Sequence, residues 1–216
     1  MSWFYLALPV VLASAAAGWL RTRRYRRLDD VIHRTLSPWL LPVFVALAAG
    51  IGAPFFAGRG APVIILYAVA LVWATVLAFI DVDVRRLPDF LTLPAYGVVA
   101  AALAAASALG DDWAALLRAA AAAGVSVAVF FLAALLSPNA EGLGFGDVKL
   151  AGVLGALLGW IGWINAVMGL LSGFVIGGVV ALVLLVAARA DRRSHISFGP
   201  AMIGGAYIWC LLTVRV

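Results

Sequence analysis

The run PVIILYAVALVWATVLAFI, at residues 62–80, decides the fold class of this chain. It holds no charged residue, and as a helix it is long enough to cross a bilayer, whose hydrocarbon core needs roughly 20 apolar residues. The whole chain shares this character, because 66% of its 216 residues are hydrophobic, only 12% are charged and the mean hydropathy is +1.12. Soluble domains carry about 25% charged residues. We therefore expect a membrane protein.

Further apolar runs on both sides of this one predict an all-α, polytopic membrane protein with about eight transmembrane helices. The runs are continuous and rich in Ala and Leu, whereas membrane strands alternate apolar and polar residues. Trp160–Trp163 is typical of a membrane interface and predicts a turn between the sixth and seventh helices. No linker interrupts the chain, so residues 1–216 are expected to form a single membrane-embedded domain. The expected helices are residues 3–19, 39–57, 62–80, 91–109, 113–136, 148–163, 165–188 and 198–215.

The basic residues predict the orientation of these helices. Eight helices in this order place twelve of the fifteen Lys and Arg residues on one side of the membrane. Cytoplasmic loops carry an excess of Lys and Arg, so this side is predicted to be the cytoplasm. The net charge of +5 then reflects membrane topology, and we expect lipid and no nucleic acid as a partner. The twelve are Arg21, Arg23, Arg24, Arg26, Arg27, Arg34, Arg85, Arg86, Lys149, Arg189, Arg192 and Arg193.

Metal and redox chemistry have little support in the sequence. The single cysteine, Cys210, lies within the last expected helix. This excludes an internal disulfide and a zinc site built from several cysteines. We expect neither a metal nor a cofactor.

The acidic residues are few enough to be considered one by one. Asp29 and Asp30 lie among arginines and are expected to balance the charge of a solvated loop. Asp81 and Asp83 end a helix, where the partial negative charge of the C-terminus opposes a carboxylate, so capping does not explain them. A solvated position at the membrane interface is the alternative. Asp89 follows a proline and is by itself an ordinary helix start.

A second polar segment, EGLGFGDVK at residues 141–149, interrupts the apolar runs. Its glycines break the helix and let the backbone approach a ligand more closely than other residues would. Asp147 then opens the next helix, where an N-cap is the alternative to a functional role.

The two segments indicate a function when they are considered together, because each places an aspartate on the same side of the membrane. Carboxylates a few ångströms apart cannot both ionise easily, so one keeps a proton at neutral pH while the other is charged. Such a pair can activate a water molecule and protonate a leaving amine. A proton or cation site of a transporter is the alternative, although transporters place such acids near the bilayer midplane.

These segments resemble the type IV prepilin peptidases, which are intramembrane aspartyl proteases with a Gly-x-Gly-Asp motif. The similarity covers about residues 65–212. Presenilin-like proteases share Gly-x-Gly-Asp but lack the arrangement of an aspartate followed by Pro-Asp, and archaeal preflagellin peptidases are close cousins. An inactive assembly component is a further alternative. The matching segments are FIDVD at 79–83, LPDFLT at 87–92, GFGDVKL at 144–150 and FGP at 198–200.

The resemblance implies a function for each of these segments. It assigns the catalytic roles to Asp81 and Asp147. It also implies an aspartic endopeptidase that removes leader peptides from type IV prepilins or pseudopilins, for pili or type II secretion, at the cytoplasmic face of the cell inner membrane. The supporting residues it implies are Asp83, Asp89, Gly144, Gly146 and Lys149.

One departure from the family concerns methyl transfer. Bifunctional members carry a cytoplasmic region with paired cysteines and methylate the new N-terminus. The corresponding residues 21–38 are short and contain no cysteine. We therefore expect a peptidase without methyltransferase activity.

Overall fold

The computed structural model describes residues 2–32, 35–56, 59–136, 144–186 and 197–212. Every regular element within these ranges is a helix, which confirms the all-α prediction. Arg34, Arg189, Arg192, Arg193 and residues 141–143 lie outside the described residues. The helices are α1 (Ser2–Arg21), α2 (Leu40–Ile51), α3 (Ala53–Phe56), α4 (Ala61–Val84), α5 (Asp89–Gly110), α6 (Trp113–Leu136), α7 (Phe145–Ile161), α8 (Trp163–Val186) and α9 (Gly199–Leu212).

The observed helices follow the predicted ones with two differences that matter. The single helix expected at 39–57 is divided into α2 and α3 around Gly52. The helix expected to end at Ile80 continues to Val84, so Asp81 and Asp83 belong to its last turns. The predicted turn near Trp160–Trp163 is confirmed, because α7 ends at Ile161 and α8 begins at Trp163.

Four of the described helices, α4, α5, α6 and α8, are long and apolar enough to cross a membrane. Shorter apolar helices cover Leu6–Arg21, Leu40–Ile51 and Gly199–Leu212. Many large apolar side chains on these helices are exposed, as lipid-facing side chains should be. The chain is therefore a multi-pass membrane protein.

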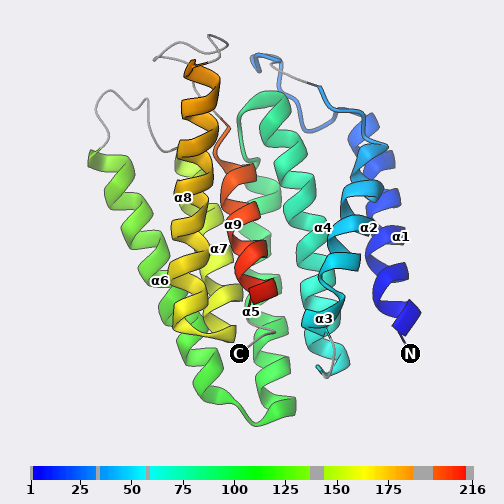
Figure 1. Ribbon diagram of the computed structural model, residues 1–216, viewed down its shortest axis with the longest axis vertical. Coiled ribbons are helices and arrows are strands. Elements are labelled where there is room, and N and C mark those ends of the chain that lie inside the picture. Colours follow the sequence, from blue (N-terminus) through cyan, green and yellow to red (C-terminus); the bar gives the residue numbers. More distant parts are fainter. Residues whose placement is uncertain (1, 33–34, 57–58, 137–143, 187–196, 213–216) are drawn as a thin grey trace.

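The helices form one bundle with their axes roughly along its length (Figure 1). α4 lies in the middle, between α1 and α2 on one side and α9 on the other. α7 packs against α5, α6, α8 and α9. Small residues allow this close packing: a Cβ added to Gly155 would lie 2.4 Å from the Ser126 hydroxyl of α6. Small residues at helix interfaces are the usual way for membrane helices to associate.

Two apolar clusters meet along α4. One joins α1, α2 and α4 through Leu20, Leu41 and Ile80. The other joins α4 to α6, α7 and α9 and includes Leu77 and Leu150. Because α4 belongs to both clusters, its C-terminal end is held firmly between the two halves of the bundle.

Candidate active site

The last turns of α4 present two carboxylates in opposite directions. Asp81 and Asp83 are both buried, with exposed fractions of 5% and 1%. Successive helical residues are rotated by about 100°, so side chains two positions apart point to nearly opposite faces. The helix ends at Arg85, which adopts a left-handed conformation with φ of 49° and donates its N–H to the carbonyl of Asp81.

Asp81 faces the beginning of α9. Its Oδ2 accepts a hydrogen bond from the Ser197 hydroxyl at 2.6 Å and another from the Gly199 N–H at 3.0 Å. Gly199 leaves the room that this contact needs, because a Cβ there would lie only 2.8 Å from Oδ2. The sequence reading included the Phe198–Pro200 segment and missed Ser197. The available signal is a hydroxyl two residues before a Gly-Pro helix start.

Asp147 lies in the first turn of α7. Gly144 occupies the N-cap and donates its N–H to Asp147 Oδ2 at 3.1 Å. Asp147 is therefore not the N-cap residue itself. The helix begins earlier, at Phe145, and Asp147 caps it from the third helical position by accepting the N–H of Gly144. Capping by one oxygen leaves the other oxygen for a second role.

The two aspartates lie in the wall of one cavity of about 360 Å³. This cavity opens between the end of α4 and the starts of α5 and α7. Its volume admits several water molecules, which a buried apolar core would exclude. The prediction that Asp81 and Asp147 lie at one site is thus confirmed in geometry. The lining residues are Arg27, Asp81, Arg85, Arg86, Leu87, Asp89, Gly144, Phe145, Gly146, Asp147 and Lys149.

The expected supporting residues on α5 and α7 also lie at this cavity. Lys149 donates a hydrogen bond to Asp89 at 2.6 Å, and this ion pair joins the starts of the two helices at the rim. Gly146 lets the start of α7 approach Leu87, since a Cβ on Gly146 would lie 3.0 Å from the Cβ of Leu87. The described residues contain no group of three or more His, Cys, Asp or Glu side chains that could hold a metal ion.

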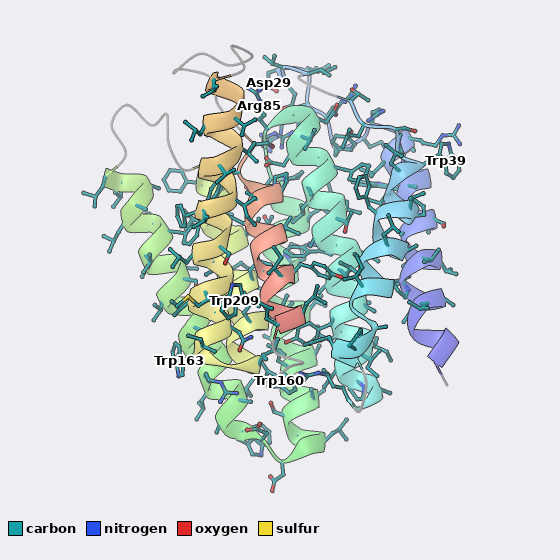
Figure 2. The ribbon with its side chains drawn as sticks, viewed as in Figure 1. Asp29, Trp39, Arg85, Trp160, Trp163 and Trp209 are labelled. Atoms are coloured by element: carbon teal, nitrogen blue, oxygen red, sulfur yellow. The ribbon has the colours of Figure 1, made fainter. Side chains whose placement is uncertain are left out.

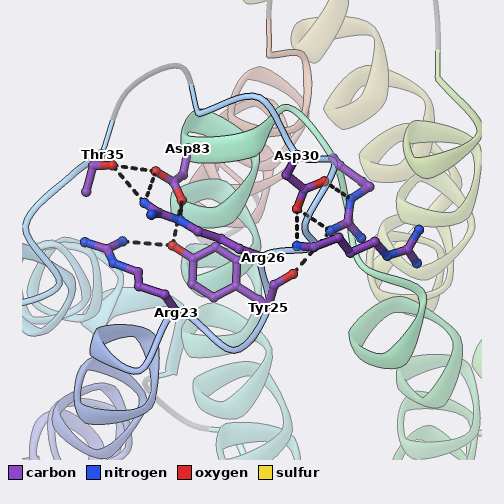
Figure 3. Close-up of polar contacts among 8 residues, drawn as sticks. Arg23, Tyr25, Arg26, Asp30, Thr35 and Asp83 are labelled. Carbon is purple, nitrogen blue, oxygen red and sulfur yellow. Dashed lines mark hydrogen bonds and ion pairs between the residues drawn. The ribbon is translucent and has the colours of Figure 1, made fainter.

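Asp83 points away from the cavity, into the loop at residues 22–32 and 35–39 (Figure 3). Arg26 donates to both of its oxygens at 2.8 Å, which makes a bidentate ion pair. The hydroxyls of Tyr25 and Thr35 donate to it at 2.8 and 2.7 Å. All of the carboxylate's hydrogen-bonding capacity is used for structure. The sequence reading had treated Arg26 as part of a solvated loop, and it gave no role to Tyr25 or Thr35.

A second ion pair fixes the same loop (Figure 3). Arg86 donates to the two oxygens of Asp30 at 3.1 and 2.7 Å, and to the carbonyl of Tyr25. The Arg86 guanidinium holds the pKa of the Asp30 carboxyl below its usual value of 3.8. Asp30 therefore does more than balance the charge of a solvated loop, because it forms a specific ion pair with Arg86, just after the end of α4.

A bundle of apolar helices with two aspartates in one polar cavity defines a membrane protein suited to acid–base chemistry at the membrane boundary. The model of the type IV leader peptidase family matches residues 68–186, more than half of the chain. The chain belongs to this family. Membership favours the prepilin-peptidase interpretation over the presenilin-like, preflagellin and transporter alternatives.

Individual relatives agree with this assignment. Prepilin leader peptidase/N-methyltransferase of Aeromonas hydrophila is 34% identical over 146 residues, which cover 66% of this chain and 48% of the relative. The protein of the same name from Stutzerimonas stutzeri is also 34% identical, over 64% of this chain and 48% of the relative. That of Pseudomonas aeruginosa is 31% identical, over 64% and 46%. The chain spans about half the length of the curated relatives it matches. No solved structure matches it.

Proposed function

We propose that this protein is an aspartic endopeptidase that removes the leader peptide of type IV prepilins or pseudopilins, with Asp81 and Asp147 as its catalytic residues. One observation carries the proposal: two aspartates from different helices, α4 and α7, line one cavity of about 360 Å³ at the end of an apolar bundle. Family membership and the names of the relatives support the peptidase reaction and the prepilin substrate.

The cavity suits a mechanism in which the two carboxyl groups share one proton. The charged carboxylate takes a proton from a water molecule as the water oxygen attacks the scissile carbonyl carbon. The protonated carboxyl then gives its proton to the leaving amine as the C–N bond breaks. The products are the leader with a new carboxylate and the mature pilin with a new amino terminus. The proton taken from water replaces the one given to the amine, so the pair again holds one proton, and the second proton of the water leaves when the new carboxyl group of the leader ionises.

In this proposal the site faces the cytoplasm. Residues 1–216 form one domain that crosses the cell inner membrane with about eight helices. Ion pairs draw the basic segments together at one end of the bundle: Arg26 with Asp83, Arg86 with Asp30, and Lys149 with Asp89. Asp29 and Arg85 lie at this end, whereas Trp160 and Trp163 lie towards the other (Figure 2). This separation fits the excess of basic residues on the cytoplasmic side.

Methyl transfer is not part of the proposal. The loop at residues 21–38 contains no cysteine, and its Tyr25, Arg26 and Asp30 are engaged in fixing α4. The N-methyltransferase in the relatives' names describes proteins of which this chain covers about half. Mass spectrometry of a pilin matured by this protein alone tests for methyl transfer. We expect the mass of the mature pilin without an added methyl group.

The deciding experiment is leader cleavage by Asp81→Asn and Asp147→Asn after co-expression with prepilins from the same genome. Asn keeps the size and much of the hydrogen bonding of Asp but cannot exchange a proton, so each variant should insert normally and lose cleavage. Asp111→Asn is the matched control, because Asp111 is an exposed C-cap with φ of 50°, a conformation that Asn tolerates. Normal cleavage by either active-site variant would exclude the shared-proton mechanism.

A further inference from the structure

The segment Ser197–Gly199 reaches Asp81 from a distant part of the chain. It leads directly into α9, and both of its polar contacts converge on a single atom, Oδ2 of Asp81. The structure gives Oδ1 of Asp81 no hydrogen-bond partner among the residues it describes, and Asp81 lines the cavity that Asp147 shares. One oxygen of this carboxylate is therefore anchored while the other remains available.

The segment is itself held in place by packing against α8. The ring of Phe198 lies 5.1 Å from the ring of Phe174, centroid to centroid. It also fills a notch at Gly177, where an added Cβ would lie 2.6 Å from Phe198 Cε2. A ring packed closely on α8 restricts the residues on either side of it. The two donors on Ser197 and Gly199 therefore have little freedom to move away from Asp81.

We propose that Ser197 and Gly199 are positioning residues for Asp81, which hold Oδ2 so that Oδ1 faces Asp147 across the cavity. The inference rests on the proposed function, in which Oδ1 exchanges the proton with water. A carboxyl group free to rotate would present either oxygen in many orientations, and misplacement of a reacting group by about 1 Å can cost roughly 100-fold in rate. The hydroxyl and the N–H also stabilise the charged carboxylate, since both donate to it.

The gap at Gly199 is as important as the two hydrogen bonds. A methyl group there would sit 2.8 Å from Oδ2 and 3.3 Å from Cγ of Asp81, so the carboxyl group would have to turn away. One turn further along α9, Gly204 has no neighbour closer than 3.9 Å to an added Cβ. Substitution by alanine is therefore expected to disturb Asp81 at Gly199 and to be tolerated at Gly204.

The experiment measures kcat and KM for leader cleavage of a purified prepilin by the full-length protein in lipid. Ser197→Ala should lower kcat roughly 10-fold, which corresponds to one lost hydrogen bond to a charged group, and leave KM unchanged. Ser197→Thr keeps the hydroxyl and should restore most of kcat. Gly199→Ala should lower kcat on the order of 100-fold. Gly204→Ala and Ser14→Ala, whose hydroxyl bonds within α1, should cleave normally.

The outcomes separate the two proposals. If Asp81→Asn cleaves normally, the proposed function fails. If Asp81→Asn is inactive while Ser197→Ala and Gly199→Ala keep full kcat, only the positioning role fails. A fall in kcat for Ser197→Ala that Ser197→Thr does not reverse would also overturn it, because a hydroxyl would then not be what Asp81 needs. If Gly199→Ala fails to insert, the comparison of Ser197→Ala with Ser197→Thr decides whether the positioning role holds.

Discussion

On the side of α4 that faces residues 22–39, Asp83 accepts four hydrogen bonds from Arg26, Tyr25 and Thr35. On the side that faces α9 and α7, the described residues hold Asp81 through Oδ2, and Asp81 borders a cavity. The two residues are buried to a similar degree. Burial therefore does not distinguish the structural carboxylate from the one proposed to be reactive. The distinguishing feature is whether every acceptor site is already used by a fixed donor.

The largest expected effect concerns the cavity side of this comparison. Asp81→Asn and Asp147→Asn should each lower cleavage by 1,000-fold or more, and the double variant should be little worse than either single one. Residues that act as one catalytic unit lose nearly all of their effect when the first is removed. Single-turnover cleavage rates of the three variants test this. Multiplication of the two single effects in the double variant would show that the aspartates act independently.

The next effect concerns the loop side. Asp83→Asn leaves the Arg26 guanidinium without a charged partner and should lower the free energy of unfolding by about 3 kcal/mol, the usual cost of breaking a buried pair. Thermal unfolding in detergent measures the change. The paired variant Asp83→Leu with Arg26→Met removes both charges and should recover much of the stability. No recovery would mean that the hydroxyl contacts, and not the ion pair, hold the loop.

A smaller effect is expected for the pair formed by Asp30 and Arg86. The pKa of Asp30 lies below its unfolded value of 3.8, so the stabilisation is present above that pH and is lost as the pH falls through the lower, folded value. Asp30→Asn should lower stability by about 1 kcal/mol at pH 7 and flatten its dependence on pH below 4. Unfolding midpoints at pH 7 and pH 3 provide the measurement. If Asp30→Asn leaves the pH dependence of stability unchanged, that dependence arises from other carboxylates.

The smallest effect on stability is expected at the cavity rim. Asp89 is exposed, and its pair with Lys149 is open to solvent, where ion pairs contribute little. Asp89→Asn should leave the unfolding midpoint close to that of the unaltered protein. The same detergent unfolding assay measures it, with Asp83→Asn as the contrasting variant. A loss as large as that of Asp83→Asn would show that the rim pair holds α5 and α7 together.

The arrangement of helices could be predicted from the sequence because lipid imposes a strong pattern on it. Continuous apolar runs located the helices, and the interfacial tryptophans near Trp160 located the turn between α7 and α8. The convergence of Asp81 and Asp147 follows from the two membrane crossings expected between them, which return the chain to the same side, and from the resemblance to a known family. Both predictions use features that act along whole helices.

The partners of the carboxylates could not be predicted in this way. Tyr25 and Thr35 come together on Asp83 only because the loop folds back over α4, and Ser197 meets Asp81 only through the packing of α9 on α8. Such contacts between distant residues leave no periodic signal in the sequence. The exact start of α7 is equally hard to predict, because Gly144 and Gly146 permit several helix starts; in the structure Asp147 caps the helix at Gly144, and Gly146 packs closely on Leu87.

α7 is much shorter than its neighbour α6, and this difference in length matters in a membrane. With 17 residues at about 1.5 Å each, α7 is about 25 Å long, whereas its neighbour α6, with 24 residues, reaches about 36 Å. Hydrocarbon is about 30 Å thick, so α7 alone is shorter than the layer that α6 can cross. If the proposed cleavage site lies at the start of α7, its height along a substrate helix depends on how the bilayer adapts to this difference in length. Longer acyl chains should move that height and slow cleavage without altering any residue.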